Sequence, residues 1–450
     1  MKACLSDELK PFMEGIKERN PGEKEFHQAV FEVARDVIPF MDKNPRYREL
    51  RILERLTEAD RIIIFRVTWE DDSGAIQTNR GFRVQHSNAI GPYKGGTRFV
   101  PGLQLCVLKA LAFEQTFKNS LTGLPMGGAK GGANFNPKGR SEREIMHFCQ
   151  QYMLELARHI GPNIDIPAGD VGAGQREISY MFGQYKRMSN EFSGVLTGKG
   201  VSFGGSLIRK EATGYGCVYM LQNVLEYHGK KLEGQPVVVS GSGNVALHVV
   251  EKLINVGAKV LTVSDSKGFV LDQKGIDDTK LNALKEIKFE RHESLEVFAK
   301  MFGLEFFPGQ RPWQVPCKIA IPCAIQNEVS KADAERLILN GCMAVLEGAN
   351  LPCEREAVEL FMRAGVIFVP AKAANAGGVA VSGMEMTQNS MRLSWTRKQL
   401  DERLHEVMAR IHEKCLQYGL EGNGYVNYRK GANISGFIKV ADAMLSCGVV

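Results

Sequence analysis

The second half of the chain alternates short, wholly apolar strand patterns with helical patterns, and this order restricts the fold more than any other feature. Such strands offer no polar face to water, so they need helices on both sides. The alternation therefore predicts a parallel sheet in a doubly wound α/β domain. The strands expected in this sheet are residues 237–239, 260–263, 318–321, 343–346 and 366–369.

The first half has a different order of elements and predicts a separate α/β domain. Residues 25–42 have the apolar spacing of an amphipathic helix. Residues 62–67 and 81–85 have strand patterns, and Asp72-Ser73-Gly74 between them predicts a hairpin turn. A length of 450 residues suits two domains of ~100–200 residues or somewhat more each.

Composition excludes several classes of protein. The 57 basic residues only slightly exceed the 51 acidic ones and are not clustered, whereas a nucleic-acid-binding protein would gather its positive charge. No apolar run reaches the ~18 residues of a membrane span, and the opening residues lack the apolar core of a signal peptide. The ten cysteines form no C-x-x-C pair. We therefore expect a cytoplasmic protein with reduced thiols that binds neither nucleic acid nor membrane.

A dinucleotide-binding turn is predicted directly after the strand at 237–239, where a glycine-rich segment opens a helix. The first glycine allows the bend, the second lets a pyrophosphate approach the backbone, and the helix N-terminus faces the phosphates. An acidic residue ends the next strand, near the ~20-residue spacing at which it would meet the ribose. An ordinary strand-to-helix turn is the alternative. The expected cofactor contacts are Gly241, Ser242, Gly243, Asn244, Val245 and Asp265.

Two glycine-rich segments of the first half, residues 91–96 and 125–132, each contain one lysine and are expected to be loops. A lysine there can bind a carboxylate as a point charge, and a partly desolvated lysine can act as a base. Solvated loop lysines are the alternative. Two polar residues on the intervening helical stretch favour an anion site. The candidates are Lys94, Lys130, Gln115 and Lys118.

Asp170 lies on a glycine-flanked turn, where a catalytic role and capping of the following segment are both open. Residues 373–378, with Ser382 behind them, follow the last predicted strand. Ligands of open α/β sheets bind beyond the carboxyl ends of the strands, so this segment could line the same cleft. A helix N-terminus made of small residues is the alternative. The nine histidines show no ligand spacing, and no metal is expected.

These segments together resemble glutamate dehydrogenase of the hexameric small-subunit type, over essentially the whole chain. The resemblance implies the reversible oxidative deamination of L-glutamate to 2-oxoglutarate and ammonia with a nicotinamide cofactor, in a homohexamer. The segments that carry it are GPYKGGTRF (91–99), LPMGGAKGG (124–132), IDIPAGDVG (164–172), LTGKG (196–200), SFGGSLIRKEATGYG (202–216), SGSGNVA (240–246) and PAKAANAGGVAVSGMEMTQNS (370–390).

The resemblance also implies roles for single residues. Lys130 would be the catalytic lysine and Asp170 its proton-transfer partner. A substrate with two carboxylates needs at least two cationic anchors, besides a neutral lysine that activates the attacking water. The other implied contacts are Lys94 and Ser382 for the side-chain carboxylate, Gln115 and Lys118 for the α-carboxylate, Gly169 for the substrate, and Thr213, Asn244 and Asn375 for the cofactor.

In this family the last helix returns to the first domain, and the two domains close on the substrate across a cleft. The expected substrate-binding and oligomerisation domain is therefore residues 1–205, rejoined by about 425–450. The expected Rossmann-like, doubly wound dinucleotide-binding domain is residues 206–424.

The residues near the expected ribose pocket favour NADP, with NAD less likely. Asp265 alone would indicate NAD, because a carboxylate repels a 2′-phosphate. Ser266, Lys288 and Arg291 can instead bind a phosphate through charge-assisted hydrogen bonds, provided that Asp265 turns away. The alternative is that Lys288 and Arg291 form a solvated helix face.

Three other functions stay open from the sequence. A related dehydrogenase could act on leucine, valine or phenylalanine, but an apolar substrate would leave Lys94 buried without a charge to bind. A non-catalytic dinucleotide-binding protein would not need both Lys130 and Asp170. A nucleic-acid-binding protein is disfavoured by the dispersed charge.

Overall fold

The computed structural model describes residues 8–422 and 424–449 and divides into two compact units. Cys4, counted above among the reduced thiols, lies outside the described residues. Unit 1 takes its described residues from Met1–Leu207, Val381–Leu400 and Asn433–Val450, and unit 2 takes them from Ile208–Ala380 and Asp401–Ala432.

Residues 381–400 belong to unit 1, although the sequence placed them in the second domain. The reason lies in helix α15 (Gly377–Met391), whose Glu385 is fully buried. Glu385 accepts hydrogen bonds from the N–H groups of Gly198 and Lys199 at 2.9 and 3.4 Å, and it pairs with the Lys199 ammonium at 3.0 Å. The chain therefore passes between the units four times rather than twice.

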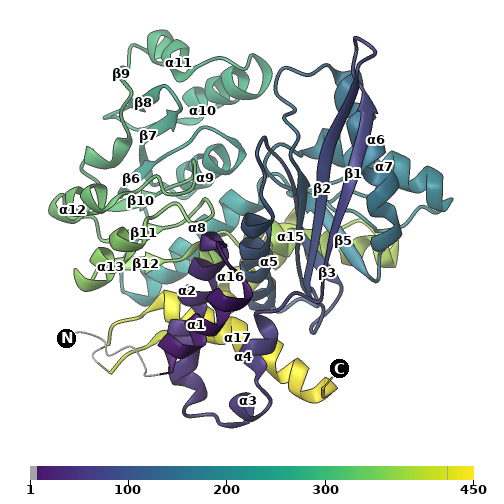
Figure 1. The fold of residues 1–450 in the computed structure, drawn as a ribbon. Coiled ribbons are helices and arrows are strands. Elements are labelled where there is room, and N and C mark those ends of the chain that lie inside the picture. Colours follow the sequence, from purple (N-terminus) through teal and green to yellow (C-terminus); the bar gives the residue numbers. More distant parts are fainter. Residues whose placement is uncertain (1–7, 423, 450) are drawn as a thin grey trace. The chain divides into compact units, whose positions relative to one another are not determined.

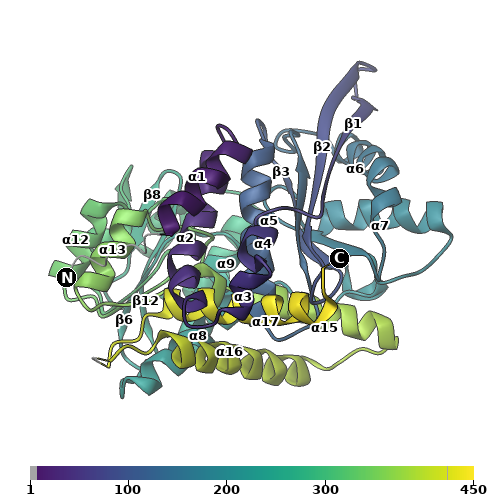
Figure 2. The same ribbon diagram turned by 60° about the horizontal axis from the view of Figure 1, so that its bottom comes forward.

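Unit 1 is built on a five-stranded mixed sheet in the order β1-β2-β4-β3-β5 (Figure 1). The predicted hairpin is confirmed, because β1 and β2 pair antiparallel from Arg61–Gln85 to Glu70–Ile76 (Figure 2). Strand β4 is antiparallel to β2, whereas β3 lies parallel to both β4 and β5. The strands are β1 (Arg61–Glu70), β2 (Ile76–Ser87), β3 (Tyr93–Phe99), β4 (Gly128–Ala133) and β5 (Asp165–Gly169).

Helices cover both faces of this sheet, with α5 (Leu105–Leu121) on one side and α6 (Glu142–Leu156) and α7 (Gln175–Ser189) on the other (Figures 1 and 2). The alternation of side chains along the strands explains the two layers. Phe82 and Val84 of β2 pack with α5, whereas Val67 and Trp69 of β1 belong to the core under α6 and α7.

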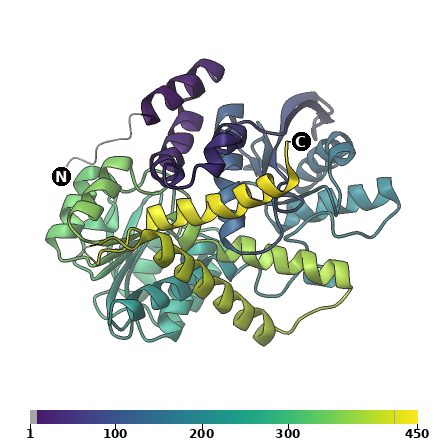
Figure 3. The same ribbon diagram turned by 90° about the horizontal axis from the view of Figure 1, so that it is seen from below.

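The first helices and the last helix of the chain form one cluster in unit 1 (Figure 3). Phe437 and Val440 of the last helix are buried with Phe26 and Val33 of the second, so the C-terminus belongs to this unit. The predicted helix at 25–42 is confirmed. The helices are α1 (Leu9–Arg19), α2 (Lys24–Met41), α3 (Arg46–Glu49), α4 (Ile52–Leu56) and α17 (Tyr428–Cys447).

Unit 2 contains a seven-stranded sheet in the order β12-β11-β10-β6-β7-β8-β9. The five predicted strands are confirmed and parallel, but β8 and β9 add an antiparallel edge that was not predicted. Each is only four residues long, and β8 returns from β7 after two residues, so β8 does not stand out as a separate strand pattern. The strands are β6 (Pro236–Val239), β7 (Lys259–Asp265), β8 (Gly268–Leu271), β9 (Glu305–Pro308), β10 (Ile319–Ile321), β11 (Ala344–Leu346) and β12 (Ile367–Val369).

Helices α12 and α13 cover one face of this sheet, and α8 and α9 lie on the other (Figures 1 and 3). The helical stretch predicted from Gln388 to about Tyr418 is interrupted, because Arg392 takes a left-handed φ of 53°. Among the helices of the described residues, none combines the length and the apolar character that a membrane span requires. The helices are α8 (Ala212–Tyr227), α9 (Asn244–Asn255), α10 (Asp278–Lys285), α11 (Leu295–Phe302), α12 (Lys331–Leu339), α13 (Arg355–Arg363), α14 (Ala371–Ala374) and α16 (Arg397–Gly419).

Candidate active site

The lysines of the two glycine-rich segments lie on strands, whereas the sequence predicted loops; only residues 91–92 and 125–127 of these segments lie outside β3 and β4. Lys94 lies on β3 and Lys130 on the adjacent β4, with only 1% and 4% of their surfaces exposed. The glycines allow close packing within the protein: a Cβ at Gly95 would collide with the carbonyl of Ala129. Both lysines are therefore held on rigid backbone and largely out of water.

Lys130, which is buried, and Asp170, which is partly buried, form an ion pair with Nζ and Oδ2 2.9 Å apart. The same carboxylate oxygen accepts a hydrogen bond from Nε of Arg98 at 2.8 Å. Gly96 of β3 leaves the space for this cluster, because a Cβ there would lie 2.8 Å from Cβ of Asp170 and 3.3 Å from Nζ of Lys130. The sequence missed Arg98, although it lies two residues beyond Gly96 on the same strand.

Asp170 is held by a turn and not by a helix end. Its backbone exchanges hydrogen bonds with Ala173, and helix α7 is capped by Gly174 with Glu177. Gly172 has a φ of 73°, and a Cβ there would collide with the Phe99 carbonyl, so this turn requires glycine. The capping role that the sequence left open for Asp170 is therefore wrong.

Burial and charge shift both pKa values in this pair. Burial is the largest effect on Lys130 and lowers the pKa of its ammonium; Arg98 lowers it further, whereas Asp170 opposes both. Burial is also the largest effect on Asp170 and favours its neutral form, but Lys130 and Arg98 outweigh it and hold the pKa of the carboxyl well below its usual range. The carboxylate thus stays ionised while the lysine is moved towards the neutral form that a base requires.

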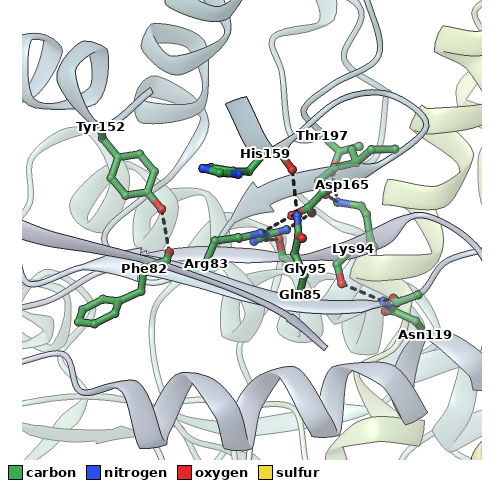
Figure 4. Close-up of polar contacts among 12 residues, drawn as sticks. Phe82, Arg83, Gln85, Lys94, Gly95, Asn119, Tyr152, His159, Asp165 and Thr197 are labelled. Carbon is green, nitrogen blue, oxygen red and sulfur yellow. Dashed lines mark hydrogen bonds and ion pairs between the residues drawn. The ribbon is translucent and has the colours of Figure 1, made fainter. Parts of the chain in front are cut away.

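Lys94 is anchored at both its side chain and its backbone (Figure 4). Nζ donates to the carbonyl of Ile166 at 3.0 Å and to Oγ1 of Thr197 at 2.7 Å. The Lys94 carbonyl accepts a hydrogen bond from Nδ2 of Asn119 at 3.0 Å. The ammonium is therefore a fixed cation in a buried position, suited to an anionic group of one defined geometry.

The remaining predicted substrate contacts occupy the same unit. Gln115 and Lys118 are half-buried on α5, three residues apart and therefore on one face of the helix. Ser382 is buried on α15, and Gly169 ends β5 next to Asp170. All predicted substrate contacts belong to unit 1, and all predicted cofactor contacts belong to unit 2.

A buried arginine that the sequence did not single out crosses the middle of the first sheet (Figure 4). Arg83 of β2 forms a bidentate, fully buried ion pair with Asp165 of β5, including a 2.8 Å bond from Nε to Oδ2. Its Nη1 also donates to the carbonyl of Gly95 at 3.3 Å. Gly131 of β4 makes the crossing possible, since a Cβ there would lie 3.0 Å from Cδ of Arg83. An arginine opposite a glycine-rich strand is the signal that could have revealed it.

The turn after β6 fits a dinucleotide. Gly241 has a φ of 87°, and its N–H donates to Oγ of Ser264 at 2.7 Å, which holds the bend. Gly243 precedes α9, and no heavy atom outside its chain neighbours lies within 4 Å of the place a Cβ would take. This open space lies at the first turn of α9, where free N–H groups can meet a phosphate. Beside it, Ser242 is buried, Val245 is half-buried, and exposed Asn244 donates from Nδ2 to the Lys210 carbonyl at 2.7 Å.

Asp265 is turned into the protein by its own neighbours. Oδ1 accepts from the N–H of Lys267 at 2.9 Å, and Oδ2 accepts from the N–H of Leu295 at 3.0 Å and from Nζ of Lys288 at 3.2 Å. Ser266 is exposed in the turn between β7 and β8. Arg291 is not brought to Asp265 by these contacts; it pairs with Glu293 at 2.7 Å. Both carboxylate oxygens of Asp265 are thus hydrogen-bonded within the protein, and the ammonium of Lys288 offsets the negative charge.

Two further predicted cofactor residues have roles within the protein's own packing. Thr213, in the first turn of α8, lies against Gly378, where a Cβ would collide with its hydroxyl. Asn375 is buried after α14, and its Nδ2 donates to the carbonyls of Gly348 and Ala349 at 3.1 and 3.2 Å. These two hydrogen bonds connect the segment after β12, which carries Asn375, with the segment after β11. The two strands are parallel neighbours in the sheet.

Family models and individual relatives of known function indicate the same family for this chain. The family model Glutamate/Leucine/Phenylalanine/Valine dehydrogenase matches residues 204–448, and the model Glu/Leu/Phe/Val dehydrogenase, dimerisation domain, matches residues 59–187. An NADP-specific glutamate dehydrogenase of Escherichia coli K12 is 55% identical over 98% of this chain and 99% of its own length. An NAD-specific glutamate dehydrogenase of Bacteroides fragilis is 49% identical over 98% of this chain and 100% of its own.

A solved structure agrees with these sequence matches. The glutamate dehydrogenase of Plasmodium falciparum superimposes with a TM-score of 0.96 at 47% identity, covering 98% of this chain and 95% of that one. This match extends over both units and over every segment that carries a candidate residue. The chain therefore belongs to the glutamate dehydrogenase family.

Proposed function

We propose that this chain catalyses the reversible oxidative deamination of L-glutamate to 2-oxoglutarate and ammonia, with NADP(H) as the preferred cofactor. The observation that carries the proposal is the ion pair between buried Lys130 and partly buried Asp170, with 2.9 Å between Nζ and Oδ2. A lysine with a lowered pKa beside an ionised carboxylate can take a proton from water and pass it on.

Lys94 and Ser382 hold the side-chain carboxylate in this proposal, while Gln115 and Lys118 hold the α-carboxylate. The ammonium of Lys94 is buried and fixed by two hydrogen bonds, so it favours a negatively charged side chain. Leucine, valine or phenylalanine offers no such charge, and for this reason we favour glutamate among the substrates named by the family model.

Lys130 and Asp170 carry the proton steps. The α-ammonium group of glutamate first loses a proton to solvent; loss of hydride from the α-carbon of the neutral amine then leaves an iminium group on the substrate, and Nζ of Lys130 removes a proton from the water whose oxygen attacks that carbon. A proton then reaches the amino nitrogen, the C–N bond breaks and ammonia leaves as the hydroxyl proton is removed. Asp170, in contact with Nζ, relays these protons.

A bound nicotinamide cofactor supplies the hydride acceptor. The chain's own contribution is the turn at Gly241–Gly243 and the first turn of α9, which leave room and N–H donors for a pyrophosphate. An ultraviolet absorbance assay with purified protein tests the proposal. Cofactor reduction that depends on glutamate is expected, and its absence with both NADP and NAD would contradict the proposed reaction.

We further propose a homo-oligomer, with the hexamer of the resembled type as the expected form, and a cytoplasmic location. The match of residues 59–187 to a dimerisation domain supports self-association. The nine cysteines of the described residues are free thiols, most of them buried, which suits a reducing compartment.

Arg98→Gln is expected to move the low-pH limb of the kcat/KM profile to higher pH. The change removes a cation that lowers the pKa of Lys130, so the lysine stays protonated up to a higher pH and the neutral base is lost sooner on acidification. Arg98→Lys keeps the charge and is the matched control. A limb that stays in place in Arg98→Gln would show that Arg98 does not tune this pair.

NADP is expected to be preferred over NAD, and a Ser266, Lys288 and Arg291 triple alanine variant should lose the preference. Lys288→Ala also frees the Asp265 carboxylate, which would then repel a 2′-phosphate. Hydrogen bonds to charged groups contribute about 1.5–3 kcal/mol, so the NADP/NAD ratio of kcat/KM should fall by about tenfold or more.

Lys285→Ala controls for this change, because Lys285 lies on the preceding helix α10 and pairs with Glu251 at 2.7 Å. Its cofactor ratio should stay at the wild-type value. A wild-type enzyme that prefers NAD, or a triple variant with an unaltered ratio, would mean that these residues do not bind the 2′-phosphate.

A further inference from the structure

Asn119, in the last turn of α5, is fully buried and hydrogen-bonds to three segments of the proposed substrate site; Figure 4 shows its bond to Lys94. Its Nδ2 donates to the Lys94 carbonyl of β3 at 3.0 Å and to the carbonyl of Gly127, just before β4. Its Oδ1 accepts from Nε2 of Gln115 at 2.7 Å. Both donors and the acceptor of this amide are therefore used.

Two of the three partners of Asn119 are proposed anchors for the two carboxylates of the substrate. Lys94 is the proposed anchor of the side-chain carboxylate, and Gln115 is a proposed anchor of the α-carboxylate. We propose that Asn119 is a positioning residue that sets the spacing between these two anchors, and with it the chain length of the amino dicarboxylic acid that is accepted. The inference rests on the proposed function and deepens it.

The neighbourhood of α5 makes this spacing rigid. Gly128 lies so close to α5 that a Cβ would collide with Oγ1 of Thr116, and Oγ of Ser120 donates to the Gly436 carbonyl at 2.8 Å. The helix is thus fixed against both β4 and α17. The hydrogen bond from the Asn119 amide to the Lys94 carbonyl then joins this fixed helix to β3.

Asn433 offers a matched control because it is an equally buried amide in the same unit. Its Nδ2 donates to the carbonyl of Glu32 and to Oδ2 of Asp36, both at 2.8 Å. None of these residues is a proposed substrate contact. Asn119→Ser and Asn433→Ser should therefore both lower the melting temperature, but only the first should alter substrate selection.

The experiment measures kcat/KM of the full-length variants for L-glutamate, L-aspartate and L-2-aminoadipate, together with KM for NADP. We expect Asn119→Ser to raise KM for glutamate about tenfold, the effect of one lost buried hydrogen bond. The selectivity for glutamate over the shorter and longer acids should fall about as much, while KM for NADP stays within about twofold. Asn433→Ser should keep the wild-type ratios.

Unchanged ratios in Asn119→Ser, or an equal change in Asn433→Ser, would overturn the inference. If Asn119→Ser does not fold, Asn119→Gln keeps the amide on a side chain one methylene longer and must show the same loss of selectivity. A wild-type protein that does not turn over glutamate would contradict the proposed function itself, whereas wild-type turnover with unaltered variant ratios would remove only the role of Asn119.

Discussion

Lys130→Ala is expected to lower kcat by about 10²–10⁴-fold, the range that a positioned general base contributes. The ammonium is buried 2.9 Å from Asp170, and its pKa is lowered mainly by burial, so its removal takes away the group that we propose activates water. Loss of the side chain creates little strain, because Lys130 lies between Ala129 and Gly131 on a strand packed through its backbone. Steady-state kinetics with saturating glutamate and cofactor measures the effect.

Lys109→Ala provides the comparison for this variant. Lys109 is also a largely buried lysine of unit 1 in an ion pair, 2.6 Å from Glu23, and it has no proposed catalytic role. It should keep most of its kcat even if its stability falls. Asp170→Asn should resemble Lys130→Ala, because it keeps the shape but removes the charge. A Lys130→Ala enzyme that retains most of its kcat would contradict the assignment, and unfolding of either site variant would favour a structural role.

The double substitution Lys94→Leu and Ser382→Ala is expected to lower kcat/KM for glutamate by about 10²–10⁴-fold. Removing one member of a buried charge pair costs about 3–5 kcal/mol, and here the partner left without its anchor is the substrate carboxylate. Norvaline and norleucine carry no such group, so their kcat/KM should fall much less or rise. The measurement is the ratio of glutamate to norvaline turnover in the wild type and the variant.

The ratio separates specificity from general damage to the site. Damage would lower the rates on charged and apolar amino acids together, because the reacting groups at Lys130 serve both. Loss of the anchor lowers only the rate on glutamate. Equal losses on both classes would show that Lys94 and Ser382 do not contact the substrate side chain.

The sequence contained the parts of the candidate site but not their contacts. Lys130 and Asp170 were both singled out, yet their distance depends on the sheet order β4-β3-β5, which places a strand between them. Gly96 on that middle strand leaves the gap that the pair fills. Arg98 and Asn119 were missed for the same reason: the groups that they link to the site, Asp170 for Arg98 and the Lys94 and Gly127 carbonyls for Asn119, lie on other segments of the chain.

Local patterns identified the two lysines but not the elements that carry them. The glycines around Lys94 and Lys130 were interpreted as ligand-binding loops, because glycine allows close backbone approach. The glycines do allow a close approach, but the approaching atoms belong to the protein itself. They are the Ala129 carbonyl of β4 at Gly95 and the Thr116 hydroxyl of α5 at Gly128. Residues 381–400 group with unit 1, which the sequence did not predict, because the N–H groups of Gly198 and Lys199 donate to Glu385 from a distant part of the chain.

The most direct test is a comparison of kcat/KM for L-glutamate, L-leucine, L-valine and L-phenylalanine with NADP, measured on one preparation of the wild-type protein. The family model names all four amino acids, so the comparison isolates the side-chain pocket of this chain. With Lys94 as a buried cation, glutamate should exceed each apolar amino acid by at least about 100-fold, since a site built for a polar group rejects analogues that lack it. An apolar amino acid that is used as well as glutamate would contradict the assignment of the pocket and of the reaction.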